Sequence, residues 1–207
     1  MKQRIPAHTT FSFFFDDSVC IDQELVFELE KNSILELSLF LCGNIERLNI
    51  SVILLGEGAH ASIRGLYVLR NNQQLTLKTE QLHRAAHGLS DCTIKGILYD
   101  AAVAQYNGTI YVEPQAQYTQ AKQLNKNILR GALARSTSVP NLQVLTKHVH
   151  CSHGSAAGPL DKHAILYMQS RGISAHQAER LLLEGFVADV LAMIPVREQE
   201  RIKTMIE

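Results

Sequence analysis

Tryptophan is absent from this chain of 207 residues, and aromatic residues make up only 6% of it. The chain therefore lacks the large flat side chain that is best suited to stack on a sugar ring. Three acids of its central part, Asp91, Asp100 and Glu113, are isolated from one another in the sequence. Because glycoside hydrolysis needs two carboxylates at one site, a carbohydrate-processing enzyme is disfavoured.

An excess of charge is missing too, since 20 Lys and Arg residues balance 20 Asp and Glu residues. No basic field is therefore present to hold nucleic acid. The longest apolar runs, such as residues 50–55, have the length of a strand and are far shorter than a membrane span. The first residues do not show the pattern of a secretory signal. We expect a cytoplasmic protein that neither binds nucleic acid nor inserts into a membrane.

Cysteine is sparse and scattered, at Cys20, Cys42, Cys92 and Cys151. No CxxC pair occurs, which disfavours a structural zinc ribbon. Without a secretory signal, reduced thiols are expected, and the first three cysteines lie among apolar residues where small buried side chains are typical. A phosphate-binding glycine loop is also missing, because residues 56–58 have the pattern of a turn. Any ATP hydrolysis must come from a partner.

Residues 11–150 have the pattern of short β-strands. Residues 33–40 form a mostly apolar run of strand length, and Ile63, Tyr67 and Leu69 share one parity. Turn signals recur at intervals of roughly 15–20 residues, as in a repeating coil. They are Gly56-Glu57-Gly58, Asn71-Asn72, Gly88, Asn107-Gly108 and Glu113-Pro114. On this pattern alone, a parallel β-solenoid and a β-sandwich both remain open.

An amide-rich segment, residues 115–127, adds weight to the solenoid, because stacked amides can form a ladder from coil to coil. An exposed polar face explains the same composition equally well.

The chain becomes helical after Gly158. Pro159 suits the first turn of a helix, and Gly172 suits its end. Ser174 with a glutamine three residues later predicts a capping box for a second helix. Pro195 separates this helix from a last short one at 196–207. We therefore expect a β-rich core at 1–157 and a small helical domain at 158–207.

The segment Cys151-Ser152-His153-Gly154 places a thiol and an imidazole two residues apart. In an extended strand both would point to the same face, where they could bind one metal or cluster. His148 and His150 have the opposite parity and would face away. A buried cysteine beside a hydrogen-bonded histidine is the alternative that involves no ligand.

Two further chemical interpretations are weaker. A nucleophile–base pair made of Cys151 and His153 lacks an obvious orienting group and an oxyanion-hole motif. His83 and His87 have the spacing of a helical metal pair, but their surroundings are typical of strand or loop.

Several ordered motifs resemble the SufB/SufD family of iron–sulfur assembly proteins, and SufD most closely. The strongest is the block at 149–161, with its Cys-Ser-His-Gly core. The segments 165–173 and 178–188 resemble the family's two helix motifs, and 106–108 and 123–129 resemble its Phe-Asn-Gly turn and its Gln-x-Asn-x-Asn segment. The resemblance covers roughly residues 56–194.

This resemblance implies a mainly β fold, a right-handed parallel β-helix with a C-terminal helical domain, and a non-catalytic scaffold role. It implies that Cys151 and His153 hold a transient iron–sulfur cluster shared across an interface, with no permanently bound cofactor. It also implies pairing with a SufB-like subunit or a second copy, and docking of a SufC-like ABC ATPase on the helices. The docking candidates are Ile165, Tyr167, Arg171, Leu181, Leu182 and Phe186.

The chain departs from the family in two respects. Family members are about twice as long and begin with a helical region, whereas a β pattern starts here almost at Met1. The functional cysteine of SufB falls within 120–127, where this chain has none. The alternative is therefore a truncated interaction module or homodimer that has lost cluster chemistry.

Overall fold

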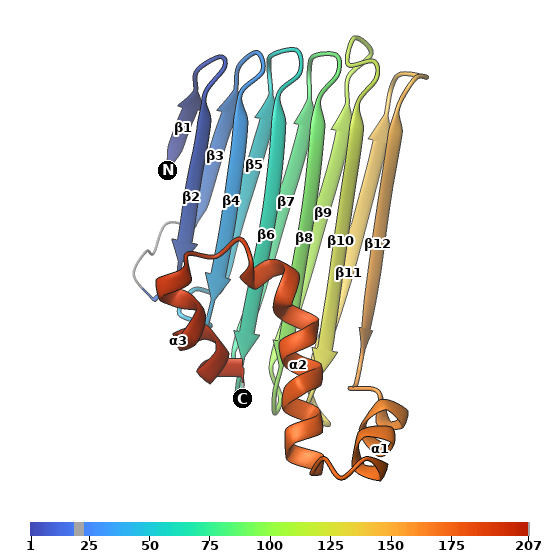
Figure 1. Cartoon of the computed structure of the whole chain (residues 1–207). Helices are drawn as coiled ribbons and strands as arrows, with labels where there is room; N and C mark the ends of the chain where they lie inside the picture. The colour runs from blue at the N-terminus through green and yellow to red at the C-terminus, as the bar shows by residue number, and fades with distance from the viewer. Residues whose placement is uncertain (19–22, 207) are drawn as a thin grey trace.

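The computed structural model describes residues 1–18 and 23–206. In this part of the chain, successive strands alternate between two six-stranded parallel sheets (Figure 1). The odd sheet contains β1 (Lys2–Ile5), β3 (Glu24–Leu29), β5 (Arg47–Leu54), β7 (Gln74–His83), β9 (Val103–Val112) and β11 (Arg135–Val144). The even sheet contains β2 (Thr10–Asp16), β4 (Ile34–Leu41), β6 (His60–Leu69), β8 (Leu89–Leu98), β10 (Gln120–Leu129) and β12 (His150–Gly158). Cys20 lies outside the described residues.

Each strand pairs in parallel with the strand two places along the chain, which is the topology of a β-solenoid. The β-sandwich alternative is thereby excluded, because its sheets are antiparallel. Mainly β structure as a parallel solenoid, followed by C-terminal helices, confirms the predicted fold class.

Equal register keeps one parity of every strand inside. Along the even sheet, Leu37, Ile63, Cys92, Gln123 and His153 follow one another in register as one column. The first four of these side chains are buried between the sheets. The burial predicted for Cys92 is confirmed, and the column changes from apolar to polar toward its C-terminal end.

A ladder of left-handed turn residues holds successive coils in register. Gly58, His87 and Tyr118 all have positive φ, of 70°, 58° and 60°. Their N–H groups donate to carbonyls of the next coil, at Ala86, Gln117 and His148 respectively. The predicted turn at 56–58 is confirmed, and the same pattern extends to later coils where the residue is not glycine.

Asn107-Gly108 was predicted as a turn, and this prediction is wrong. Both residues lie in the middle of β9. Gly108 faces the interior, where an added Cβ would lie 2.1 Å from Nε2 of Gln123. Glycine is required at position 108 because the Gln123 amide of the opposite sheet fills the space that a side chain would take. No turn is involved.

The helices are α1 (Lys162–Ser170), α2 (Ala175–Leu191) and α3 (Val196–Ile206). The capping box of Ser174 with Gln177 is present as predicted. Pro159 precedes the first helix and does not lie in its first turn, because Asp161 is the N-cap and accepts from the His163 N–H at 2.8 Å. Among the described residues, no helix combines the length and apolar character needed to cross a membrane.

A second apolar core joins α2 and α3 to the outward face of the even sheet. Leu66 and Ile97 of the sheet pack in one cluster with Val187, Val190 and Ile202 of the helices. Lys95 in β8 fixes α2 further, since its Nζ donates to the Phe186 carbonyl at 2.5 Å and to Asp189 at 2.6 Å. Figure 1 shows α1 beyond the lower edge of the sheet, beside the start of α2.

We expect Gly108→Ala to destabilise the protein by about 1–3 kcal/mol, because the methyl group overpacks the interior against Gln123. Gly185→Ala is the matched control, since nothing lies within 4 Å of its Cβ position in helix α2. There alanine is expected to stabilise by about 0.5–1 kcal/mol. Urea unfolding of both variants measures the two effects, and equal effects would contradict the assigned interior position of Gly108.

Candidate functional site

Cys151 and His153 lie on the inward parity of β12, the last strand of the even sheet. Cys151 is in register with buried Ala121, and His153 with buried Gln123. Side chains two residues apart on a strand are about 7 Å apart along it and share one face. The structure therefore brings the two predicted ligands together at the C-terminal end of the solenoid.

Cys151 is half-buried beside a small apolar cluster that includes Ala116, Ala121, Val144 and Val149. Partial burial raises the pKa of the Cys151 thiol above its ordinary value, and a hydrogen bond with the Ala121 backbone opposes the increase. Burial therefore favours the thiol over the thiolate at this position. Because metals bind the thiolate, an incoming metal must displace this proton.

His153 is exposed, because β12 is the last strand of the even sheet in the described part of the chain. Its neighbour in register, Gln123, accepts a long 3.5 Å hydrogen bond from Gln81. The Nε2 of Gln123 is buried and has no hydrogen-bond partner in the described part of the chain. His153 therefore lies at the open end of the solenoid, next to buried polar groups of the interior.

The amide segment has two structural roles. Gln115, Gln117 and Gln120 are exposed, whereas Gln123, Asn125 and Asn127 are buried. Inside, Asn125 donates to the Ile94 carbonyl at 3.2 Å and Asn127 donates to Asn125 at 2.9 Å. The exposed-face interpretation is thus correct for the first group. The ladder of stacked amides is not found among the described residues, because the interior bonds run to the Ile94 backbone and along one strand.

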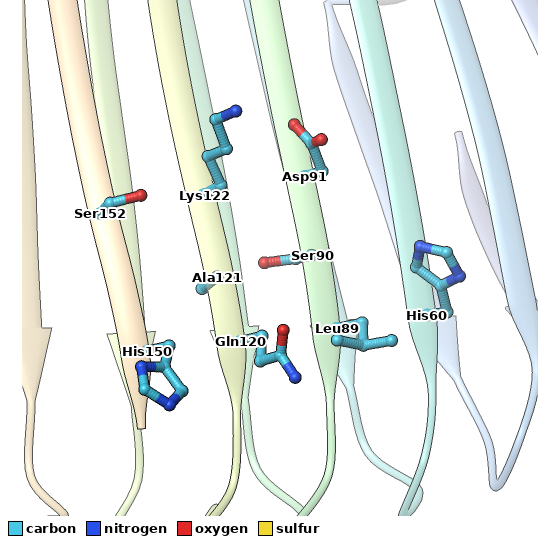
Figure 2. Close-up of a pocket in the computed structure, with 9 residues that line it drawn as sticks. All are labelled: His60, Leu89, Ser90, Asp91, Gln120, Ala121, Lys122, His150 and Ser152. Atoms are coloured by element: carbon cyan, nitrogen blue, oxygen red, sulfur yellow. The ribbon is translucent and has the colours of Figure 1, made fainter. Parts of the chain in front are cut away.

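The outward face of the same end is a shallow groove of about 330 Å³. Figure 2 shows His150 and Ser152 of β12 beside Lys122 of β10 and Asp91 of β8 on this face. The predicted separation of His150 from the Cys151/His153 face is confirmed by this placement. The groove is open, its lining is about equally polar and apolar, and Cys151 is not among its lining residues.

The other histidine pair does not form a common site. His83 is fully buried, and its Nε2 lies 2.8 Å from the Ser90 hydroxyl. His87 lies in a turn and stacks on Tyr118, with ring centroids 5.0 Å apart. Tyr118 in turn stacks on His148 at 5.8 Å.

Asp16, Asp17 and Cys42 form a cluster that the sequence did not predict. The Asp17 carboxylate accepts from the backbone N–H groups of Cys42, Gly43 and Asn44. Asp16 pairs with Arg201. Burial and the hydrogen bond to Asp17 raise the pKa of Cys42 to about 12. Existing donors satisfy these carboxylates, so the cluster stabilises a loop and needs no cation. Adjacent acids after a phenylalanine run were its only sequence signal.

The docking candidates fall into exposed and buried groups. Tyr167 and Leu181 are 62% and 48% exposed, and Arg171 is exposed with its guanidinium 5.4 Å from the Tyr167 ring. Ile165 and Leu182 are half-buried. Phe186 packs against the even sheet, and Lys95 lies 5.0 Å from its ring.

Comparison with known proteins agrees with this architecture. The family model described as "SUF system FeS cluster assembly, SufBD core domain" matches residues 8–186. The chain therefore belongs to the SufBD family, and the resemblance seen in its motifs is confirmed.

Among its relatives is the iron–sulfur cluster assembly protein SufD of Escherichia coli, 32% identical over 74% of this chain and 36% of the relative. The SufBD family protein ML0594 of Mycobacterium leprae is 31% identical over 86% of this chain and 48% of the relative. The chloroplastic protein ABCI7 of Arabidopsis thaliana is 31% identical over 75% of this chain and 33% of the relative. The chain thus spans between a third and a half of these relatives.

Acid should destabilise the fold through His83. Burial lowers the pKa of His83 from 6.5 to about 4, so the unfolded chain binds this proton more readily. The stability that depends on a neutral His83 is fully present above pH 6.5 and is lost as the pH falls toward 4. This loss amounts to about 3 kcal/mol. Chemical unfolding at pH 7 and pH 4 should show a smaller loss for His83→Gln than for the wild type. The exposed control His150→Gln should behave as the wild type does.

Proposed function

We propose that this chain is a SufD-like scaffold subunit for iron–sulfur cluster assembly, without catalytic activity of its own. One observation carries the proposal: Cys151 and His153 share the inward face of the strand at which the solenoid stops. The SufBD core match and the SufD relatives support the assembly role.

The ligand count requires a partner at this site. Iron–sulfur clusters are held mostly by cysteine thiolates, with histidine as an occasional replacement, and an iron site is normally filled by several protein ligands. This chain supplies one thiol and one imidazole, both near the start of β12. A transient cluster would therefore be shared with a facing subunit, either SufB-like or a second copy.

The outer edge of β12 is suited to such pairing. His150 donates its N–H to Thr119 across the β10 side at 2.9 Å. Because backbone groups alternate along a parallel strand, those of Cys151, His153 and Ser155 face the free edge. On neighbouring β11 the Arg135 N–H faces β9, so Pro140 falls on the free-edge side and removes a donor there. Strand addition is thus favoured at β12, where the two candidate ligands lie.

The first two helices offer a separate surface for a SufC-like ABC ATPase. Helix α1 buries no residue against the protein, and Leu166, Tyr167 and Leu181 are 62%, 62% and 48% exposed. Phe186 packs against the even sheet and so holds α2, which carries part of this surface, in place. Exposed apolar groups beside Arg171 are typical of a protein interface. The free thiols of Cys42, Cys92 and Cys151 agree with a reducing compartment such as the cytoplasm.

The site is tested by Cys151→Ser and His153→Ala, singly and together. Each should reduce the cluster assembled on the complex to the background level, measured by absorbance and by iron and sulfide content. His150→Ala is the matched control, because this side chain is on the same strand but the opposite face. Normal assembly by the double variant would instead favour a truncated interaction module that has lost cluster chemistry.

The docking surface is tested by Tyr167→Ala and Leu181→Ala. Each truncation should weaken binding of a SufC-like ATPase about tenfold, the cost of an interface anchor of about 1–2 kcal/mol. Val196→Ala in α3 is the control, because Val196 is 81% exposed and lies on another helix. Calorimetric titration gives the affinities, and unchanged binding by both variants would refute this surface.

A further inference from the structure

Gln123 is the neighbour of His153 on the adjoining strand, inside the solenoid. The two residues are in register between β10 and β12, on the inner face of the even sheet. Neighbouring strands of a sheet are about 4.8 Å apart, so the two side chains start side by side. On its other side Gln123 is in register with the buried thiol of Cys92. Of these two neighbours, His153 is the one with ring nitrogens that form strong hydrogen bonds.

The side-chain amide of Gln123 is buried, but only one of its two ends has a partner. The side chain is 1% exposed, and its Oε1 accepts a long 3.5 Å bond from Nε2 of Gln81. Nε2 of Gln123 and Oε1 of Gln81 are both buried without a hydrogen-bond partner in the described part of the chain. Such atoms destabilise a fold unless they find a partner. Gln123 therefore has one unused hydrogen-bonding position beside His153.

Gly108 on the opposite sheet shows how far this amide extends. A Cβ at residue 108 would lie 2.1 Å from Nε2 and 2.4 Å from Cδ of Gln123. The amide thus reaches across the interior to β9 and is not folded back against its own strand. An imidazole that turns inward from the same position of the next strand would lie alongside this amide.

We propose that Gln123 is the positioning residue for His153: its amide oxygen accepts the N–H of one ring nitrogen and leaves the other nitrogen for iron. This inference rests on the proposed function and deepens it. A histidine that binds a metal usually donates its second ring N–H to an acceptor, which fixes the tautomer and the orientation of the ring. Without such an acceptor, the exposed ring of His153 is held by its own strand alone.

The Gln81–Gln123 pair can present this acceptor by a turn of both amides through 180°. Nε2 of Gln123 then donates to Oε1 of Gln81, so the two atoms that lacked partners bond to each other. Oε1 of Gln123 takes the open position and accepts from His153. One buried atom without a partner, Nε2 of Gln81, remains where there were two. Binding of the imidazole therefore improves the hydrogen bonding of the interior.

The test is a titration of the full chain with Co²⁺, followed by the absorption that a cobalt–thiolate bond produces. Gln123→Leu should weaken binding about 10–100-fold, as loss of an outer-shell partner does. Gln123→Glu keeps an acceptor and should restore the affinity. Asn125→Leu is the matched control, because Asn125 is a buried amide of the same strand and face but is in register with Ser155. It should bind Co²⁺ as the wild type does.

A spectroscopic signature separates positioning from a general loss of structure. In the Co²⁺-loaded wild type, the ring N–H of His153 should give a shifted proton resonance that exchanges slowly with solvent. Gln123→Leu should lose this resonance, and Asn125→Leu should keep it. If Gln123→Leu fails to fold, the wild type decides, because rapid exchange of this proton would contradict the bond to Gln123.

Unchanged affinity in Gln123→Leu, or an equal loss in Asn125→Leu, would overturn the inference, as would a loss that Gln123→Glu does not restore. Cys151→Ser distinguishes this failure from failure of the proposed function. If Cys151→Ser abolishes the thiolate absorption while Gln123→Leu binds normally, the role of Gln123 is wrong and the ligand pair stands. If the wild type shows no absorption that depends on Cys151, the ligand pair is wrong, and the role of Gln123 falls with it.

Discussion

The lateral register of the parallel strands is the constraint on which every other feature of this protein depends. Side chains alternate between two faces, so a slip by one residue would exchange the inner and outer sets of a strand. The turn ladder through Gly58, His87 and Tyr118 opposes such a slip by bonding each coil to the next. Because the register is kept to β12, Cys151 and His153 lie on the inner face and His150 lies on the outer face.

The interior changes character along the stack. Early coils are filled by side chains such as Leu37 and Ile63, whereas later ones contain Gln81, His83 and Gln123. Buried polar groups without partners cost stability, and several occur in these later coils. The C-terminal end therefore contains polar groups beside a small apolar cluster, and it is open at its edge. Such an end is suited to a shared, transient site and is poorly suited to a closed core.

Much of this architecture could be predicted from local signals. The Ser174 capping box, the strand near 33–40 and the parity of 151 and 153 each depend on neighbouring residues only. Asn107-Gly108 was misassigned as a turn because Gly108 is needed to leave space for the Gln123 side chain of the opposite sheet. No local sequence pattern shows that contact. The same limit explains Phe186, whose apolar character did not indicate whether it faces the sheet or a partner. The family motifs indicated Cys151 and His153 as candidate ligands, but the open edge of β12 appeared only with the strand order.

We propose that the free edge of β12 receives a partner strand and that this pairing closes the Cys151/His153 site. Hydrogen exchange at single-residue resolution, with and without a SufB-like subunit, tests it most directly. In the complex, the amides of Cys151, His153, Ser155 and Ala157 should become protected, while those of His150 and Ser152 stay as they are, because they already bond to β10. Protection at β11 or on the helices alone, with unchanged exchange along β12, would show that no partner strand pairs with β12.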